Sequence, residues 1–372
     1  MGCMPMSSPL FQPYTFGPIP LKHRVVLCPL TRYKVDAAHV PLLPLMKEYY
    51  TQRASTPGTL LIAEATIIAA KAGGFLMPGI WSQDQIKAWK EVTDSVHARG
   101  SFTFLQILAQ GRNATLSILK DEDPSLDLVG PSNVPISPDD EDKPHPLTVA
   151  EIEEYVGLYV QAAKNAIQAG FDGVEIHGAN GFLVDQFLQD VSNDRADDYG
   201  GSIENRARFP LAVVKAVAEV VGEERTGIRF SPWSPFAGMG MADPVPTFSH
   251  VISEIRRLHP KLAYLHLIEP RINADSTAET TAENAAQSNE VFFDLWGDRP
   301  LIVAGGHTRE SAMKLAAERE NVLVAFGRHF LANPDLPLRL EKNLPLNPYD
   351  RSTFYLAGQN DPKGYTDYPF AE

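Results

Sequence analysis

A histidine and an asparagine stand three residues apart directly after an apolar run. The segment HGANGF, from His177 to Phe182, follows the run FDGVEI. Imidazole and carboxamide groups both donate hydrogen bonds, so the end of this apolar run carries two polar side chains that need partners. For a histidine alone, the simpler interpretation is a hydrogen bond to a neighbouring carbonyl group. A bound ligand is the alternative partner for His177 and Asn180.

Two other apolar runs contain polar side chains that core strands seldom carry, Gln106 and Arg229. A half-buried polar group needs a hydrogen-bond partner, and a bound ligand can be that partner. Two structural alternatives stay open on the residues alone. Arg229 could form an ion pair within the core, and Gln106 could form a hydrogen bond within a layer of the core.

Glycines and an arginine end two later apolar runs. LIVAGG ends in Gly305 and Gly306, and VLVAFGR ends in Gly327 and Arg328. A backbone without side chains lets an anion approach closely, and a planar guanidinium group suits phosphate. The glycine pair could simply turn the chain, but Arg328 at the end of the next run favours a phosphate site.

The elements that must position these residues are eight short, continuously apolar runs, which are typical of buried parallel strands. Their polar residues fall at the carboxyl ends, where the active sites of (β/α)₈ barrels lie. The alternation of these runs with helical stretches favours one closed (β/α)₈ TIM barrel. The eight runs are Val25–Leu30, Thr59–Ala65, Phe102–Leu108, Gly173–Gly178, Thr226–Ser231, Leu262–Ile268, Leu301–Gly306 and Val322–Arg328.

Stretches with helical period separate most of the runs. The clearest covers residues 148–170, where Thr148 and Glu151 predict a capping box and Gly170 ends the helix. Residues 202–222 and 308–320 show the same period. No G-x-G-x-x-G motif follows the first run, which weakens the alternative of an open, doubly wound sheet.

The chain of 372 residues is longer than the roughly 250 residues of a bare barrel. We place the surplus in a long excursion after the third strand, Gln110 to Leu147, and in a polar insertion from Glu269 to Ser288. The tail from Leu344 is rich in Tyr, Phe and Pro, and we expect it to pack on the barrel. Because no break in composition occurs, we expect one domain over residues 1–372.

Composition excludes several classes of protein. The net charge of −13 argues against nucleic-acid binding, and no run approaches eighteen consecutive apolar residues, so we expect no membrane span. The two cysteines, Cys3 and Cys28, give no disulfide framework, and the first ten residues show no signal peptide. We therefore expect a cytoplasmic protein. The strand ends lack a cluster of His, Asp and Glu, so we expect no metal site.

The residues from Leu10 to Phe370 resemble the old yellow enzymes, which are FMN-dependent ene-reductases. The narrower stretches EYYTQRASTPGTLLIAEAT and MPGIWS are similar to fungal members of the ergot-alkaloid chanoclavine-aldehyde reductase and isomerase type. The motifs that carry the family resemblance are HRVVLCPLTR, EIHGANGF, QFLQDVSNDRADDYGGSIENRARF, GIRFSP, AGG, AFGRHFLANPDLPLRL, YDRSTFY and YTDYPF.

The resemblance implies noncovalently bound FMN and assigns residues to it. Arg229 and Gln106 would bind the pyrimidine edge of the flavin, and positive charge there stabilises the reduced cofactor. Phe354 would cover the ring and Tyr355 would face the substrate, although both aromatics could serve packing alone. The remaining implied FMN contacts are Pro29, Leu30, Thr31, Ala65, Gly305, Gly306, Gly327 and Arg328.

The resemblance also implies a reaction. His177 and Asn180 would donate hydrogen bonds to the carbonyl oxygen of a small enone or enal, while hydride passes from flavin N5 to the β-carbon. NADPH would first reduce the flavin at the same face, which gives ping-pong kinetics. The oligomeric state, monomer or homodimer, stays open. A flavin-binding barrel without turnover is a rival interpretation that the intact His177, Asn180 and Arg229 disfavour.

Phe182 departs from the family pattern. Most relatives carry a tyrosine there that delivers a proton to the α-carbon, and general-acid help of this kind is worth about 10²–10⁴ in rate. Without it, the enolate would live longer and its former double bond could rotate. Reduction would be weakened, and a redox-neutral isomerisation or cyclisation becomes an alternative outcome. Tyr33 and Tyr355 are candidate substitutes.

Leu108 is a second departure. The family often carries an aromatic residue two positions after Gln106, whereas this chain has Leu108. The smaller side chain predicts a wider substrate pocket, so Leu108 and Phe182 join Tyr355 as expected substrate contacts.

Overall fold

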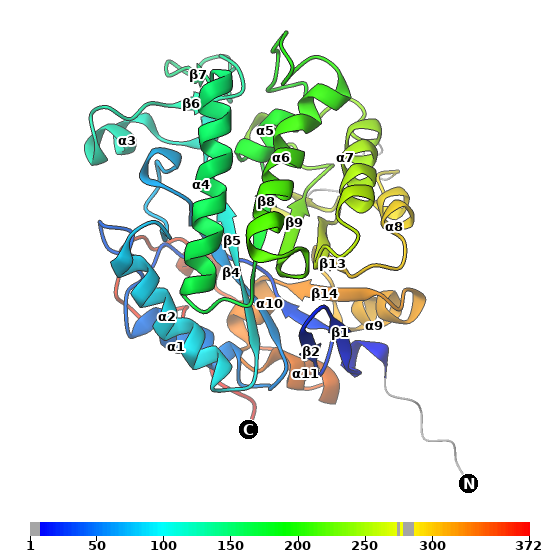
Figure 1. Cartoon of the computed structure of the whole chain (residues 1–372). Coiled ribbons are helices and arrows are strands. Elements are labelled where there is room, and N and C mark those ends of the chain that lie inside the picture. The colour runs from blue at the N-terminus through cyan, green and yellow to red at the C-terminus, as the bar shows by residue number, and fades with distance from the viewer. Residues whose placement is uncertain (1–7, 274–275, 278–285) are drawn as a thin grey trace.

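Eight parallel strands close into a barrel at the centre of this computed structural model, which describes residues 8–273, 276–277 and 286–372 (Figure 1). Each strand matches one predicted run, although β4 extends two residues beyond its run, and neighbouring strands are parallel throughout. The predicted TIM barrel is therefore confirmed. Its strands are β3 (Val25–Leu27), β4 (Leu60–Ile67), β5 (Phe102–Leu108), β8 (Gly173–Gly178), β9 (Thr226–Phe230), β10 (Tyr264–Ile268), β13 (Leu301–Ala304) and β14 (Val322–Phe326).

Three barrel strands are shorter than predicted at the ends that carry site residues, and the last of them, β14, ends at Phe326, before Gly327 and Arg328. The first ends at Leu27, because Pro29 has no backbone N–H to donate to a neighbouring strand. The seventh ends at Ala304, before the glycine pair, whose positive φ angles leave the extended conformation. The residues expected to contact a ligand therefore lie just outside the ladder.

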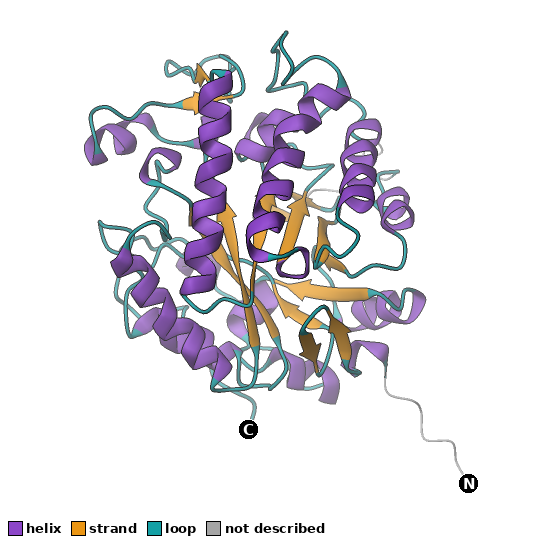
Figure 2. Cartoon of the chain, in the orientation of Figure 1, coloured by secondary structure: helices purple, strands orange, loops and turns teal. Residues whose placement is uncertain are grey.

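Helices surround the barrel and separate its strands, as Figure 2 shows. The three predicted helices are confirmed, and Thr148 and Glu151 form the predicted capping box. The α-helices are α1 (Leu45–Arg53), α2 (Gln83–His97), α3 (Leu116–Glu122), α4 (Val149–Gln168), α5 (Leu183–Leu188), α6 (Ile203–Val221), α7 (Val245–Leu258), α8 (Glu290–Trp296), α9 (Arg309–Glu318), α10 (Arg328–Ala332) and α11 (Leu336–Lys342). Short 3₁₀ segments are Pro9–Phe11, Ala70–Ala72, Gly111–Asn113, Glu223–Arg225, Phe236–Gly238 and Arg351–Thr353.

A hairpin that the sequence analysis did not predict closes the amino-terminal end of the barrel. Strands β1 (Tyr14–Phe16) and β2 (Ile19–Leu21) pair antiparallel, and Phe16 packs against Phe104 and Tyr264 from two barrel strands. These rings belong to a buried cluster that fills this end of the barrel. The opposite, carboxyl-terminal end is left for the functional residues.

The long excursion after the third strand and the aromatic tail lie where they were predicted. The excursion carries α3 and the short strands β6 (Val129–Gly130) and β7 (His145–Pro146). In the tail, Tyr365 is fully buried and stacks on Tyr49 with 4.2 Å between ring centroids. Strands β11 (Ile272–Asn273) and β12 (Ser276–Thr277) begin the predicted insertion after the sixth strand. The rest of that insertion up to residue 285, and the first seven residues with Cys3, lie outside the described residues.

No helix among the described residues is long and apolar enough to cross a bilayer. No group of three or more His, Cys, Asp or Glu side chains in the same residues is arranged to hold a metal ion.

Candidate active site

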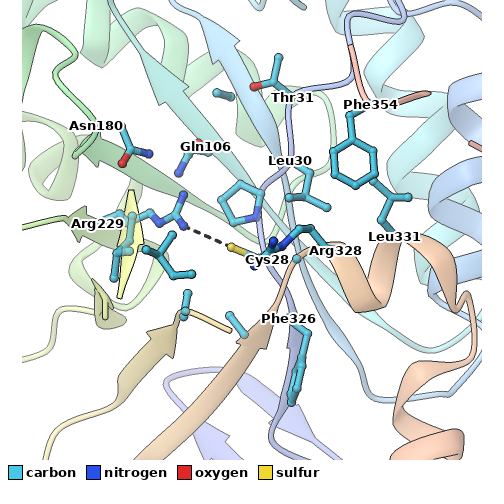
Figure 3. A pocket seen from close by; sticks show the side chains of 18 of the residues that line it. Cys28, Leu30, Thr31, Gln106, Asn180, Arg229, Phe326, Arg328, Leu331 and Phe354 are labelled. Carbon is cyan, nitrogen blue, oxygen red and sulfur yellow. Dashed lines mark hydrogen bonds between the residues drawn. The ribbon is translucent and has the colours of Figure 1, made fainter. Parts of the chain in front are cut away.

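A cavity of about 550 Å³ opens at the carboxyl-terminal end of the barrel (Figure 3). Every predicted site residue except Leu108 lines it, although the residues come from opposite ends of the chain. The predicted residues in its lining are Pro29, Leu30, Thr31, Ala65, Gln106, His177, Asn180, Phe182, Arg229, Gly305, Gly306, Gly327, Arg328, Phe354 and Tyr355.

Leu108 is not among the residues that line the cavity. Its side chain is fully buried in the main hydrophobic core, and it pairs with Ile67 at the end of β4. Its expected contact with the substrate, and the wider pocket inferred from it, stay predictions.

His177 presents a neutral imidazole to the cavity. Its Nδ1 accepts a hydrogen bond from the backbone N–H of Ala179 at 3.3 Å, which leaves the ring hydrogen on Nε2. Burial, and after it the nearby positive charge of Arg229, holds the pKa of His177 well below its ordinary value. The ring therefore offers one N–H donor and carries no charge of its own.

Asn180 is held in the left-handed backbone region, with φ of 55°. Three contacts fix this turn. The Asn180 N–H donates to Ser231 Oγ at 2.8 Å, and the N–H of Gly181 donates to Asp185 Oδ2 at 2.9 Å. Gln186 Nε2 in turn donates to the Gly181 carbonyl at 2.7 Å. The Asn180 Oδ1 atom finds no partner among the described residues.

Arg229 lies across the bottom of the cavity, and its Nη2 donates to Cys28 Sγ at 3.2 Å, the dashed line in Figure 3. Its Nε is buried and lacks a hydrogen-bond partner within the described part of the chain. Gln106 comes from β5 and lies on the same side of the cavity in that view. A buried donor without a partner is costly, so a ligand that accepts from Arg229 would restore a lost interaction.

Another part of the cavity lining is glycine backbone. Gly305 and Gly306 have positive φ angles of 142° and 63°. A Cβ added at Gly305 would stand 2.6 Å from Glu269 Cβ, and one added at Gly327 would stand 3.2 Å from Leu30 Cδ2. A side chain is therefore excluded at Gly305 and would be tight at Gly327, and Arg328 supplies positive charge in the same lining.

Aromatic side chains from loops and from the tail form the upper wall. Tyr33 and Tyr355 meet edge to face at 5.9 Å, and Phe182 packs edge-on against His177 at 4.7 Å. Phe354 lies at one end of the cavity in Figure 3.

Arg32 fixes the tail segment to which Phe354 belongs. This side chain is buried and donates to three tail carbonyls, those of Thr353 at 3.1 Å, Phe354 at 3.0 Å and Gly364 at 2.8 Å.

The sequence analysis missed several lining residues. Cys28 and Arg32 directly flank the predicted Pro29–Thr31 segment, and His307 directly follows the predicted glycine pair, so chain adjacency could have found them. Phe236 also lines the cavity, but it lies in the loop after β9, where no apolar periodicity marks it.

FMN, the cofactor that the resemblance implies, fits this cavity in three respects. Arg229 offers an unpartnered buried N–H beside Gln106 for a polar ring edge. The glycine backbone and Arg328 suit a phosphate. No Asp or Glu side chain lines the cavity among the described residues, so no carboxylate would directly contact an anionic group there.

Comparisons with known proteins agree with this fit. A family profile described as NADH:flavin oxidoreductase / NADH oxidase matches residues 9–347. The chain is 49% identical over 368 residues to the chanoclavine-I aldehyde reductase fgaOx3 of Penicillium roqueforti, covering 97% of this chain and 96% of the relative. It is 48% identical over 374 residues to easA of Epichloe festucae var. lolii, described as a probable inactive reductase, with 98% and 96% covered.

The fold has a matching solved structure. The Old Yellow Enzyme from a Pichia species superposes with a TM-score of 0.89 at 35% identity, and the match covers 98% of this chain and 95% of that one. From this match, the family profile and the site geometry together, the chain belongs to the NADH:flavin oxidoreductase / NADH oxidase family and is an FMN-dependent oxidoreductase of the old yellow enzyme type.

Proposed function

We propose that this protein acts on the activated carbon–carbon double bond of an α,β-unsaturated aldehyde or ketone in fungal secondary metabolism. The observation that carries the proposal is the neutral imidazole of His177 beside Asn180 on the wall of one cavity with Arg229. Two donors that meet at one place suit a carbonyl oxygen on which charge develops. A relative that is 49% identical is a chanoclavine-I aldehyde reductase, which fits an aldehyde substrate.

Different residues would hold the cofactor and the substrate. Gln106 and Arg229 would hold the ring edge of FMN, while Gly305, Gly306, Gly327 and Arg328 would hold its phosphate, with Pro29, Leu30, Thr31, Ala65 and Phe354 around the ring. Bound FMN, reduced by NADPH, would supply the two electrons and the hydrogen that the double bond takes up. His177 and Asn180 would hold the substrate oxygen and lower the barrier by stabilising its negative charge.

Phe182 has no acidic hydrogen and cannot donate the proton that completes the reduction. The phenyl ring of Phe182 packs against His177, where a tyrosine would have placed a hydroxyl group. Tyr33 and Tyr355 both line the cavity, so both predicted substitutes are at the site. Burial, and then the nearby Glu64, raise the pKa of Tyr33, which makes it a weak acid. Tyr355 is about half exposed, at 48%.

A second candidate function follows from Phe182. If protonation is slow, the enolate oxygen stays bound to His177 and Asn180 while the bond between the α- and β-carbons rotates. Return of the hydrogen to the cofactor would then give an isomerised or cyclised product without net reduction. Reduction and isomerisation differ in one measurable quantity, the amount of NADPH consumed per molecule of product.

Phe182→Tyr tests the proton-delivery argument. With 2-cyclohexen-1-one as probe, reduced product should form about 10²-fold faster or more in the variant, because the hydroxyl group supplies the proton. Phe236→Tyr is the matched control, since it adds a hydroxyl group elsewhere in the same lining and should change the rate little. An unchanged rate in Phe182→Tyr would reject the argument.

The same preparation tests turnover itself. In a catalytic protein, NADPH should bleach the flavin absorbance and an enone should then restore it. A protein that binds FMN without catalysis would not complete this cycle. A flavin that bleaches but is not reoxidised by the enone would remove the proposed substrate class.

We further propose that residues 1–372 act as one FMN-binding domain in the cytoplasm. Support for one domain comes from the main core, in which Leu10 and Tyr365 from opposite ends of the chain take part. The sequence holds only two cysteines, too few for a disulfide framework, which supports a reducing compartment. The oligomeric state, monomer or homodimer, is open to measurement by light scattering.

A further inference from the structure

A buried pair of ionisable side chains lies next to the bottom of the cavity but does not line it. Glu175 on β8 and His266 on β10 are both fully buried inside the barrel. Strand register places them beside cavity residues, because Glu175 pairs with Gln106 on β5 and His266 pairs with Arg229 on β9. Burying a carboxylate costs free energy unless the group is paired, so the presence of Glu175 and His266 at this position calls for an explanation.

Both carboxylate oxygens of Glu175 are engaged. Oε1 accepts a hydrogen bond from Gln106 Nε2 at 2.7 Å, and Oε2 lies 2.8 Å from His266 Nδ1. Burial lowers the pKa of His266, which keeps the ring neutral with Nδ1–H as the donor. Burial alone would raise the pKa of Glu175, but His266 and Arg229 outweigh it and lower that pKa below its ordinary value. Glu175 is therefore ionised at neutral pH.

An ionised carboxylate decides which way the Gln106 amide faces. A carboxylate only accepts hydrogen bonds, so the atom of Gln106 that faces it must be the NH₂ group. The carbonyl Oε1 is then the group that Gln106 offers to the cavity, beside the donor groups of Arg229. An acceptor next to a donor complements an imide edge, in which an N–H lies beside a carbonyl oxygen.

We propose that Glu175 is a positioning residue that His266 orients and that acts on the cofactor through its neighbours. It fixes Gln106 as a hydrogen-bond acceptor toward the ring edge. Its negative charge also offsets part of the positive field of Arg229 at the same edge. The inference rests on the proposed roles of Gln106 and Arg229 in holding FMN.

The negative charge of Glu175 predicts the direction in which the relative binding of oxidised and reduced FMN should change. Reduced FMN carries more negative charge than oxidised FMN, so it gains more from a positive field. Unit charges several ångström apart in a protein interior change a binding equilibrium roughly tenfold or more. Neutralising Glu175 should therefore tighten the binding of reduced FMN relative to oxidised FMN. A purely structural role for Glu175 predicts weaker binding of both forms and no such preference.

The experiment compares the holoenzyme with Glu175→Gln, which keeps the shape and removes the charge. The ratio of the dissociation constants of oxidised and reduced FMN should rise about tenfold, which raises the two-electron potential by about 30 mV. Glu219→Gln is the matched control. It removes the same charge from an exposed helix position, where Glu219 pairs with Lys215 at 2.7 Å, and should leave the ratio unchanged.

Variants of His266 provide a second test should Glu175→Gln fail to fold. His266→Asn keeps a donor toward Glu175 and should keep the wild-type ratio. His266→Leu removes the donor, so the buried carboxylate should take up a proton and the ratio should rise as in Glu175→Gln. Equal ratios in the Asn and Leu variants would overturn the proposal.

Failure of this inference can be told apart from failure of the proposed function. A folded Glu175→Gln protein that binds FMN with the wild-type ratio overturns the role of Glu175 and leaves the FMN site intact. A wild-type chain that takes up no FMN removes the proposed function itself.

Discussion

The lower and upper parts of the cavity are built in different ways. The lower part, here called the floor, consists of Gln106, His177 and Arg229, which lie on barrel strands. The upper part, here called the rim, consists of Tyr33, Phe182, Phe236 and Tyr355, which lie on loops and on the tail. Floor residues are polar and fixed by strand register, whereas rim residues are aromatic and depend on where each loop packs.

The difference separates two properties of the enzyme. The floor holds groups that grip a cofactor and an oxygen atom, and a register shift in the barrel would be needed to move them. The rim can change by single substitutions without disturbing the barrel, and Phe182 is such a change. The chemistry should therefore be set by the floor, and the fate of the product by the rim.

The largest effect should come from a floor substitution. His177→Ala removes one donor to the substrate oxygen and should slow oxidation of the reduced enzyme by 2-cyclohexen-1-one about 10²–10³-fold. The affinity for FMN, measured by fluorescence, should stay within about threefold, because the FMN contacts proposed for Gln106 and Arg229 remain. Phe236→Leu on the rim serves as control and should change the rate only a few-fold. Similar losses in both variants would remove the distinction between floor and rim.

A smaller effect should follow from releasing the tail that carries part of the rim. Arg32→Met leaves three tail carbonyls without their donor, so the free energy of unfolding should fall by about 2 kcal/mol. Urea denaturation measures the loss, and limited proteolysis should cut the tail first. Arg225→Met, at an exposed position, is the control. Full protection of the tail in Arg32→Met would show that other contacts hold it.

The smallest effect should be a pH dependence of the free energy of unfolding, caused by buried carboxyl groups near the rim. Glu64 accepts a hydrogen bond from the backbone N–H of Arg32 at 3.1 Å, and burial raises its pKa from an ordinary 4.5 to about 7. A raised carboxyl pKa means that the folded state binds more protons than the unfolded state between these values. Stability should therefore fall as pH rises from about 4.5 to 7.

Between about pH 4.5 and 7, the free energy of unfolding should fall by at least about 1 kcal/mol less in Glu64→Gln than in the wild type. Urea denaturation across this pH range measures the difference. Asp185, beneath the HGANGF segment, should add a similar slope, since burial also raises its pKa to about 7. Glu153→Gln on the exposed face of α4 is the control. A slope that survives in the double variant Glu64→Gln/Asp185→Asn would assign it to other groups.

The floor could be predicted from sequence, and the rim could be predicted only in part. Continuous apolar runs mark buried strands, and a polar residue that ends such a run stands out against them, as His177 and Arg229 do. Phe236 carries no such mark, because an aromatic residue in a loop looks the same whether it packs inward or lines a cavity. Leu108 is buried in the core and is not among the lining residues, so its expected contact with the substrate stays a prediction.

Contacts between distant parts of the chain account for most of what was missed. The link between Arg32 and the tail joins residues more than three hundred positions apart, and nothing local to either segment predicts it. The hairpin of β1 and β2 is two three-residue strands, too short for a pattern of alternation to be read. Each depends on tertiary packing.

That hairpin has a consequence for how reactants reach the cofactor. Phe16, Ile19 and Leu21 seal the amino-terminal end of the barrel with a dry cluster. Nicotinamide donor and unsaturated acceptor must then arrive through a shared entrance at the other end, where one departs before the next can bind. Competition between the two reactants for the oxidised and reduced enzyme is thus a property of the fold, because a barrel closed at one end has no separate exit.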